Sequence, residues 1–109
     1  MTDRELVEGY WKKAEFRPED KMMPQYGGRI ISYGSGEFLT DSHLSESEAW
    51  AAAAAYTREH QEKVRLVDEE IEEIRRVMNL SSGRYYAVYD RILAKLQAEK
   101  EGLLRGVKR

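Results

Sequence analysis

The two histidines of this chain, His43 and His60, are the residues best suited to metal or acid–base chemistry. A neutral imidazole binds metals, and its charge changes near neutral pH. His43 closely follows Asp41, and together with Glu46 these side chains would offer three donors to a metal ion. The same segment also has the composition of an ordinary turn and helix cap, and no further strong ligand is apparent in it. A small metal- or ligand-binding protein with its site near His43 is therefore one alternative for the function.

The sequence contains none of the patterns that would identify an enzyme. Di-metal carboxylate sites in helix bundles use Glu-x-x-His pairs, but Thr40 and Thr57 stand three positions before the two histidines. Residues 34–36 read Gly-Ser-Gly, which matches neither the GxSxG of a nucleophile elbow nor the GxxxxGK[ST] of a phosphate-binding loop. The absence of cysteine excludes disulfides and thiolate chemistry. We therefore expect a non-enzymatic protein with no cofactor and no bound metal.

Basic and aromatic residues alternate between Arg84 and Arg91, a composition that suits nucleic acid. The whole chain has a net charge of −2, yet residues 79–109 hold seven bases and three acids. Tyr85 and Tyr89 already belong to the predicted packing seam, so only Tyr86 of these tyrosines is left to contact nucleic acid. A nucleic-acid-associated regulatory protein that uses Arg84, Arg91 and Lys95 is therefore a further alternative.

The composition of the chain indicates a small protein with long helices. Of its 109 residues, 35% are charged and 41% are hydrophobic, and this charge content suits exposed helical faces. The length corresponds to a single domain. The first residues lack the apolar run of a signal peptide, and no stretch reaches the roughly 20 apolar residues of a membrane span. We expect a cytoplasmic protein that does not enter a membrane.

Residues 46–78 are predicted to form one long helix that organises the chain. Ser45 and Glu48 match a capping box at its start, and the stretch contains neither proline nor glycine. Residues suited to packing recur at alternating spacings of three and four, as a coiled-coil-like seam requires. The seam consists of Trp50, Ala53, Thr57, His60, Val64, Val67, Ile71, Ile74 and Met78. Its first half is small or polar and its second half is aliphatic, so we expect the two halves to meet different neighbours.

A second helix is predicted over residues 84–104, after a turn at residues 79–83. Its seam consists of Tyr85, Tyr89, Ile92, Leu96, Glu99 and Leu103, with Val88 and Leu93 beside it. A short connection makes neighbouring helices antiparallel. Folding about residue 81 would place the acidic run of residues 68–73 opposite Arg91 and Lys95. Residues 106–109 are expected to form a loose basic tail.

The first 44 residues are predicted to form a small head. Thr2 and Glu5 match a capping box that begins a short helix over residues 3–14, whose Trp–Tyr stripe must be buried. Residues 16–25 contain two prolines and are interpreted as a connector. Two β-favouring runs, at residues 29–33 and 37–40, flank a Gly-Ser-Gly turn and predict a β-hairpin. The expected fold class is therefore mainly α (α+β), with a long antiparallel helical hairpin and a small head.

The length of the predicted hairpin indicates a function in protein interaction. At 1.5 Å per residue the first helix would be about 50 Å long, whereas a compact globule of this size has a radius of gyration of about 13 Å. Part of the seam would stay uncovered, and a second copy would cover it in a four-helix arrangement. We therefore expect an interaction module that forms a homodimer or a higher homo-oligomer through the hairpin, with another protein as a further candidate partner. The residues expected to take part are Trp11, Trp50, Val64, Val67, Ile71, Ile74, Met78, Tyr85, Tyr89, Ile92 and Leu96.

Overall fold

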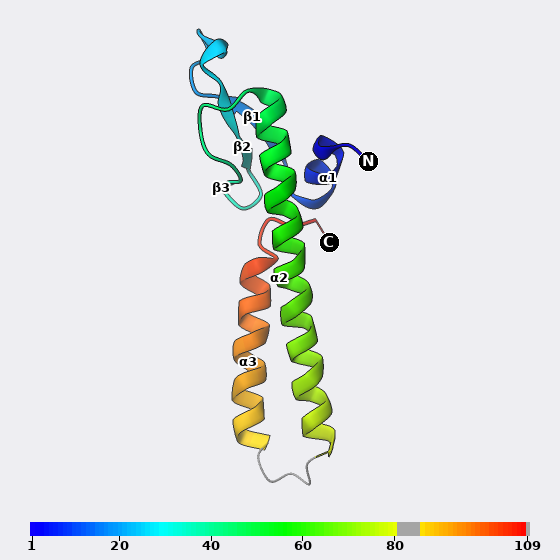
Figure 1. The fold of residues 1–109 in the computed structure, drawn as a ribbon. Coiled ribbons are helices and arrows are strands. Elements are labelled where there is room, and N and C mark those ends of the chain that lie inside the picture. The colour runs from blue at the N-terminus through cyan, green and yellow to red at the C-terminus, as the bar shows by residue number, and fades with distance from the viewer. Residues whose placement is uncertain (81–85, 109) are drawn as a thin grey trace. The chain divides into compact units, whose positions relative to one another are not determined.

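The fold combines three helices with a three-stranded antiparallel sheet, which confirms the predicted α+β class (Figure 1). A computed structural model describes residues 1–80 and 86–108. In chain order the elements are α1 (Asp3–Tyr10), β1 (Ala14–Pro18), the 3-10 turn η1 (Pro24–Tyr26), β2 (Gly28–Ser32), β3 (Glu37–Phe38), α2 (Glu46–Leu80) and α3 (Tyr86–Leu103).

The chain divides into two compact units, and α2 contributes to both. The head unit consists of Met1–Glu59 together with Arg105–Arg109, and the hairpin unit consists of His60–Leu104. The division falls where the predicted seam changes from small and polar residues to aliphatic ones. The first part of α2 therefore belongs with the head, and the second part belongs with α3.

The two predicted capping boxes are present and explain where α1 and α2 begin. The Thr2 hydroxyl accepts a hydrogen bond from the backbone N–H of Glu5 at 3.1 Å. The Ser45 hydroxyl accepts one from the backbone N–H of Glu48 at 3.2 Å and donates to its carboxylate at 2.7 Å. Each cap satisfies an amide that has no partner within its own helix. Local sequence alone is sufficient to fix both helix starts.

Helix α1 ends at Tyr10, four residues before the predicted end at residue 14. Trp11 adopts an extended conformation at the helix end, and its indole Nε1–H donates to the Thr57 hydroxyl on α2 at 2.9 Å. Its ring also stacks on Tyr56, with centroids 5.9 Å apart. Trp11 is 1% exposed. These contacts with α2 stop the helix, although its apolar period would have allowed it to continue.

The sheet has the order β1-β2-β3 and contains a strand that the sequence analysis interpreted as a connector. β1 pairs antiparallel with β2, with Ala14 opposite Ser32 and Pro18 opposite Gly28. β2 and β3 form the predicted β-hairpin, in which Ile31 lies opposite Phe38. The connector interpretation is wrong because Pro18 does not interrupt β1 but stands at its end, on an edge strand where proline is tolerated.

Residues 106–108 are not the loose tail that was predicted. Val107 forms an isolated antiparallel bridge with Trp11. The Lys12 N–H donates to the Gly106 carbonyl at 2.7 Å, and the Lys108 N–H donates to the Tyr10 carbonyl at 2.8 Å. Val107 is 4% exposed. A pairing between residues about 95 positions apart leaves no signal in local composition, so sequence analysis could not have found it.

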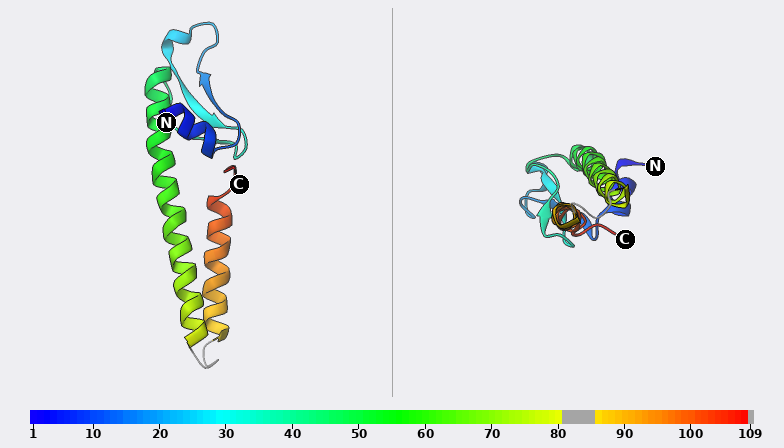
Figure 2. Two further views of the ribbon diagram at one scale, coloured as in Figure 1. Left: turned by 90° about the vertical axis from the view of Figure 1, so that its right-hand side faces the viewer. Right: turned by 90° about the horizontal axis from the view of Figure 1, so that it is seen from below.

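In the hairpin unit α3 runs antiparallel beside the second part of α2, as the two views of Figures 1 and 2 agree. Lys100 on α3 and Asp68 on α2 form an ion pair at 2.5 Å. This register differs from the predicted one, which placed the acidic run opposite Arg91 and Lys95. The helix bounds differ as well: α2 continues to Leu80, two residues past its predicted end, and α3 begins at Tyr86, two residues past its predicted start.

Candidate functional site

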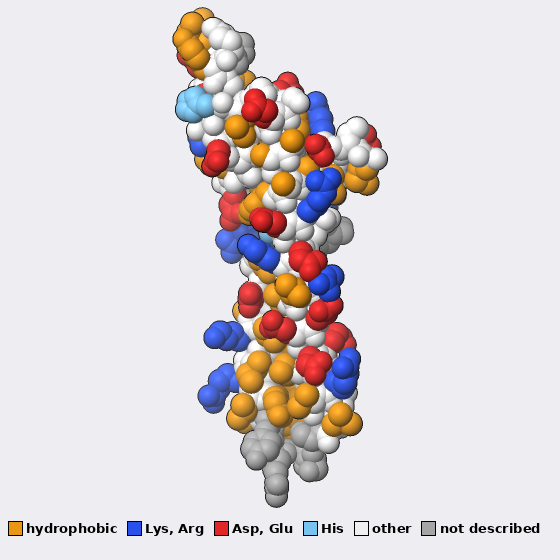
Figure 3. Space-filling model, viewed as in Figure 1, with side chains coloured by type: hydrophobic (Ala, Val, Ile, Leu, Met, Phe, Trp, Pro, Cys, Tyr) orange, Lys and Arg blue, Asp and Glu red, His pale blue; other side chains and the backbone are white. Residues whose placement is uncertain are grey.

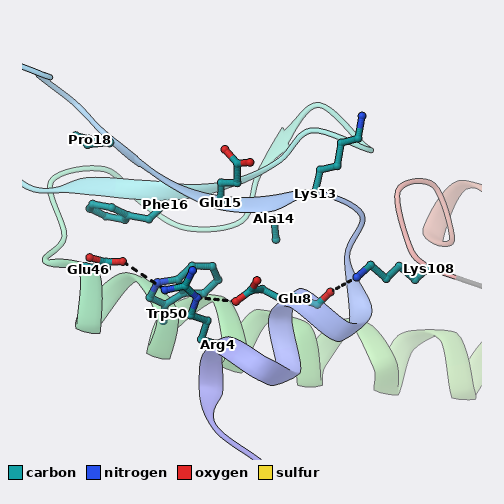
Figure 4. Close-up of a pocket in the computed structure, with 10 residues that line it drawn as sticks. All are labelled: Arg4, Glu8, Lys13, Ala14, Glu15, Phe16, Pro18, Glu46, Trp50 and Lys108. Carbon is teal, nitrogen blue, oxygen red and sulfur yellow. Dashed lines mark hydrogen bonds and ion pairs between the residues drawn. The ribbon is translucent and has the colours of Figure 1, made fainter.

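A groove with a volume of about 560 Å³ lies in the head unit. Its lining comes from α1, from β1, from the start of α2 and from the C-terminal segment (Figure 4). The lining residues are Arg4, Glu8, Lys13, Ala14, Glu15, Phe16, Pro18, Glu46, Trp50 and Lys108. Three cationic and three anionic side chains thus surround an apolar floor. A groove of this size falls within the range of about 300–1,000 Å³ that is usual for ligand sites.

Arg4 holds a central position in this groove (Figure 4). Its guanidinium pairs with Glu8 at 2.6 Å and with Glu46 at 3.9 Å, and it lies over the Trp50 ring with its Cζ 5.1 Å from the centroid. The Arg4 side chain is 59% exposed, so these contacts are weak and it can move away at little cost. Arg4 therefore covers Trp50 without sealing it.

Trp50 differs from Trp11 in one chemical respect. Both rings are buried, Trp50 being 6% exposed. The Nε1–H of Trp11 has the Thr57 hydroxyl as its acceptor, whereas the Nε1–H of Trp50 has no acceptor among the described residues. A buried donor without a partner costs about 1–3 kcal/mol. Buried polar groups without a partner are uncommon in folded proteins, so the unused N–H of Trp50 singles this groove out from the rest of the core.

The segment around His43 does not assemble the three-donor site that the sequence suggested. His43 lies in the left-handed region with φ of 64°, and its Nδ1 is 3.0 Å from the Ser42 hydroxyl. It lines a second groove of about 450 Å³ with Tyr26, Glu46 and Glu48, and Asp41 is not among the lining residues. Within residues 1–80 and 86–108, no group of three or more His, Cys, Asp or Glu side chains could hold a metal ion.

The predicted seam of α2 is confirmed as the inward face of this helix. Trp50, Ala53, Thr57, His60, Val67 and Ile71 are buried, and Val64, Ile74 and Met78 are half-buried. Trp11 lies in the core of the head unit, where the described chain already covers it. A role of these residues in binding a partner stays a prediction.

The inward face of α3 differs from the predicted one. Tyr89, Leu93, Leu96, Lys100 and Leu103 are half-buried, whereas Ile92 and Glu99 are exposed. Tyr85, Arg84 and the rest of residues 81–85 lie outside the described residues. The inward line of α3 therefore passes through Leu93 and Lys100 instead of Ile92 and Glu99, and Lys100 on this line pairs with Asp68. No described residue of α3 is fully buried.

The hairpin unit has two different flanks. One is lined by charged and polar side chains, which together with Ile71 are Asp68, Glu72, Arg75, Gln97, Lys100 and Glu101. With 3.6 residues per turn, Val88 and Ile92 lie on the opposite flank of the inward face of α3. Val88 is 52% exposed and Ile92 is 39% exposed. Figure 3 shows hydrophobic side chains gathered over this part of the hairpin unit. The flank with Val88 and Ile92 is therefore the more apolar of the two, although Lys95 and Glu99 are exposed on the same side of α3.

The acidic run of α2 is neutralised largely by its own helix. Arg65 donates to both Glu62 and Glu69, and Arg75 and Arg76 pair with Glu72 and Glu73 at 3.3 and 3.4 Å. The hydrogen bond from Arg65 lowers the pKa of Glu62, and the same bond raises the pKa of Arg65. Among the described residues neither Arg91 nor Lys95 forms an ion pair with this run, and the α3 residue that does so is Lys100, with Asp68.

Comparison with known proteins gives no further assignment. The chain matches no protein-family model, no curated protein and no solved structure. Among the helices of the described ranges, none combines the length and the apolar character needed to cross a membrane.

Proposed function

We propose that this protein is a non-enzymatic interaction module whose hairpin unit associates with a second copy of itself. The observation that carries the proposal is the apolar flank of the hairpin unit, where Val88 and Ile92 stay exposed on a helix that has no fully buried residue in its described part. Burying a Val or Ile side chain contributes about 1.5–3 kcal/mol. A partner helix laid along this flank would gain about half of that contribution from each residue, because Val88 is 52% and Ile92 39% exposed.

A second copy fits this flank because helical hairpins associate readily into four-helix arrangements. Such a pair would be related by two-fold symmetry, so the same flank would serve both copies. The opposite flank, with Asp68 and Lys100, is charged and already paired, and it would remain in solvent. The coiled-coil-like spacing of the α2 seam supports the same arrangement.

Sedimentation equilibrium of the full chain tests this proposal. We expect a dimer at micromolar concentrations, and a monomer when Val88 and Ile92 are both replaced by Glu, because four carboxylates would then be buried in the interface. Ala94→Glu is the matched control: Ala94 is exposed and lies 200° around the helix from Ile92. The control should remain a dimer. A wild-type chain that stays monomeric, or a control that dissociates as completely as the double variant, would refute the proposal.

A second candidate function, nucleic-acid binding, is favoured by one observation. Arg91 and Lys95 stand one turn apart on α3, both are exposed, and neither has an ion-pair partner in the described part of the chain. Two adjacent cations would contact the phosphate backbone, and the affinity would fall steeply with salt. An electrophoretic shift at low salt that disappears in Arg91→Glu/Lys95→Glu would support this candidate. Absence of any shift at low salt would remove it.

The expectation of a cytoplasmic, cofactor-free protein belongs to this proposal. An interaction module needs neither a metal nor a cofactor, and the site near His43 lacks a third donor within the described structure. The small-ligand alternative therefore has less support than association through the hairpin. A thermal shift on addition of Zn²⁺ that His43→Ala abolishes would restore it.

A further inference from the structure

Strand β1 presents a free edge toward the groove of the head unit. In an antiparallel ladder the N–H and C=O groups of successive residues point to opposite sides of the strand. On β2, Gly28 exchanges hydrogen bonds with Leu44, and the Ile30 carbonyl accepts from Leu39. The backbone N–H and C=O groups of Gly28 and Ile30 therefore point away from β1. The alternate residues, Arg29 and Ile31, direct their backbone groups toward β1.

The same alternation fixes which groups of β1 are unused. The Tyr33 N–H donates to the Lys13 carbonyl at 3.2 Å, and the Glu19 N–H donates to the Gly27 carbonyl at 2.9 Å. Odd-numbered residues of β1 thus face β2, and Ala14 and Phe16 direct their N–H and C=O groups outward. These outward groups have no backbone partner in the described structure. Pro18 also lies at an outward position, but proline has no N–H, so it can offer only its carbonyl to a neighbouring strand.

The free edge and the groove coincide. Ala14, Phe16 and Pro18 all line the groove, and Figure 4 shows Ala14 and Phe16 on the side of β1 that faces Trp50, with Glu15 and Lys13 on the other side. An added strand lies about 4.8 Å from its neighbour. The groove thus offers backbone groups along one wall and an apolar floor of Trp50 and Phe16.

The charges at the two ends of the groove differ in sign. Lys13 and Lys108 lie at the end where β1 begins, where the Lys108 ammonium also donates to the Glu8 carbonyl. Glu46 lies toward the other end, where it pairs with Arg4 (Figure 4). Once Arg4 moves aside, Glu46 is the charge that remains at that end. A strand antiparallel to β1 would place its C-terminal end near the two lysines and its N-terminal end near Glu46. The charge pattern therefore favours a guest with an acidic residue at its C-terminal end and a basic residue at its N-terminal end.

We propose that this groove binds an extended peptide segment of another protein, which joins the sheet as an additional strand antiparallel to β1. The guest pairs with the outward groups of Ala14 and Phe16 and lays a large apolar side chain over Trp50. Arg4 moves aside from the Trp50 ring and is free to pair with a guest carboxylate. Strand addition to an exposed sheet edge is a recurring mode of peptide recognition, in which backbone bonds give affinity and side-chain pockets give specificity. This inference is independent of association through the hairpin unit.

The first experiment tests backbone pairing with the full-length protein. The probe is a fluorescein-labelled heptapeptide, Lys-Val-Thr-Phe-Thr-Val-Glu, whose residues favour strands, and binding is followed by fluorescence anisotropy. Two N-methylated versions carry the methyl groups on alternate amides, either the second, fourth and sixth or the third and fifth. One version should lose binding at least about tenfold and the other should bind as the parent does, because amides on only one side of the guest face β1. Equal binding of the two versions, or no binding of the parent at millimolar protein, would overturn the proposal.

The second experiment tests orientation by a charge exchange. A reversed-charge probe, Glu-Val-Thr-Phe-Thr-Val-Lys, should bind the wild type about tenfold more weakly than the parent probe does, a difference that corresponds to about 1.4 kcal/mol. The double variant Lys13→Asp/Glu46→Lys should reverse this preference, and Asp is chosen because it tolerates the φ of 53° at position 13. A misfolded variant could not show a reversed preference, so this result also shows that the variant is folded. An unchanged preference in a folded variant would contradict the proposed orientation of the guest. If the parent probe bound only by displacing a second copy of the chain, the guest would be that copy and not a peptide of another protein.

Discussion

The head unit and the hairpin unit bury their apolar residues to different extents. In the head, Val7 and Ile30 are 0% exposed and Trp11 is 1% exposed. In the hairpin unit the most buried apolar residues, Ile71 and Val67, both belong to α2, and no described residue of α3 is fully buried. The head is closed by pairings between residues far apart in the sequence. The hairpin is held by one line of half-buried side chains, so it is the unit that gains most from a partner.

The largest difference between the units should be seen when a central side chain of each is removed. Trp11→Ala leaves a cavity, breaks the bond to Thr57 and loses the stack on Tyr56, so we expect a loss of about 3–5 kcal/mol in the free energy of unfolding. Leu96→Ala, at a half-buried position of α3, should cost about 1 kcal/mol at concentrations where the chain is monomeric. Urea denaturation followed by circular dichroism measures both values. Equal losses would mean that the two units are packed alike.

A pair of glycine substitutions tests how the C-terminal segment closes the head. Gly106 has φ of 77°, and a Cβ there would lie 2.5 Å from the Ser35 Cβ and 2.7 Å from the Ser35 backbone nitrogen. Gly36 has φ of 74° but nothing within 4 Å of a Cβ. Gly36→Ala should therefore cost about 1 kcal/mol from backbone strain, and Gly106→Ala should cost more, because Ser35 must also move. Thermal unfolding of both variants gives the comparison, and the same melting temperature for the two would show that residues 106–108 do not close the head.

The smallest expected effect concerns two tyrosines of the head at alkaline pH. Burial raises the pKa of Tyr10, with a further contribution from Tyr56. Burial likewise raises the pKa of Tyr56, followed by the charges of Glu37 and Glu59. The unfolded chain ionises first, at about pH 10. The stability that these groups contribute is therefore present below that pH and is lost as the pH rises through their folded pKa values.

Absorbance titration at 295 nm and urea unfolding on both sides of pH 10 check this prediction. Tyr10→Phe/Tyr56→Phe should lose less stability than the wild type over the same rise in pH, and the late-titrating part of the absorbance change should disappear. An unchanged titration curve in the double variant would show that neither tyrosine is the late-titrating group.

Sequence patterns predicted the features of this fold that depend on nearby residues. Ser45 with Glu48 fixed the start of α2, and the alternating spacing from Trp50 to Met78 identified its inward face. These signals are local, because a cap spans four residues and a seam repeats every turn. The β2–β3 hairpin was predicted for the same reason, from a glycine turn between two β-favouring runs.

The features that sequence analysis missed depend on distant contacts or on a weak signal. The end of α1 is set by the contacts of Trp11 with Thr57 and Val107, which no local pattern encodes. β1 had a signal, the alternation of apolar and charged residues over Ala14–Pro18, but Pro18 at its end and Pro24 after it concealed this signal. The groove beside β1 could not be predicted, because its lining comes from four separate segments of the chain.

The rotation of α3 was also beyond the sequence pattern. Two seams fit its apolar residues, one through Ile92 and one through Leu93, and they differ by a single step around the helix. In the structure the second seam faces inward, and Lys100 of that seam pairs with Asp68. The choice between the two seams depends on contacts between the helices, which local spacing does not encode.

Hydrogen exchange measured by mass spectrometry at low and high protein concentration tests the central claim most directly, because it reads both units in one experiment. If the hairpin unit is completed by a second copy, amides of α3 around Val88 and Ile92 should exchange more slowly as the concentration rises, while amides of the head around Val7 and Ile30 keep the same rate. Exchange rates of α3 that do not depend on concentration would contradict the account.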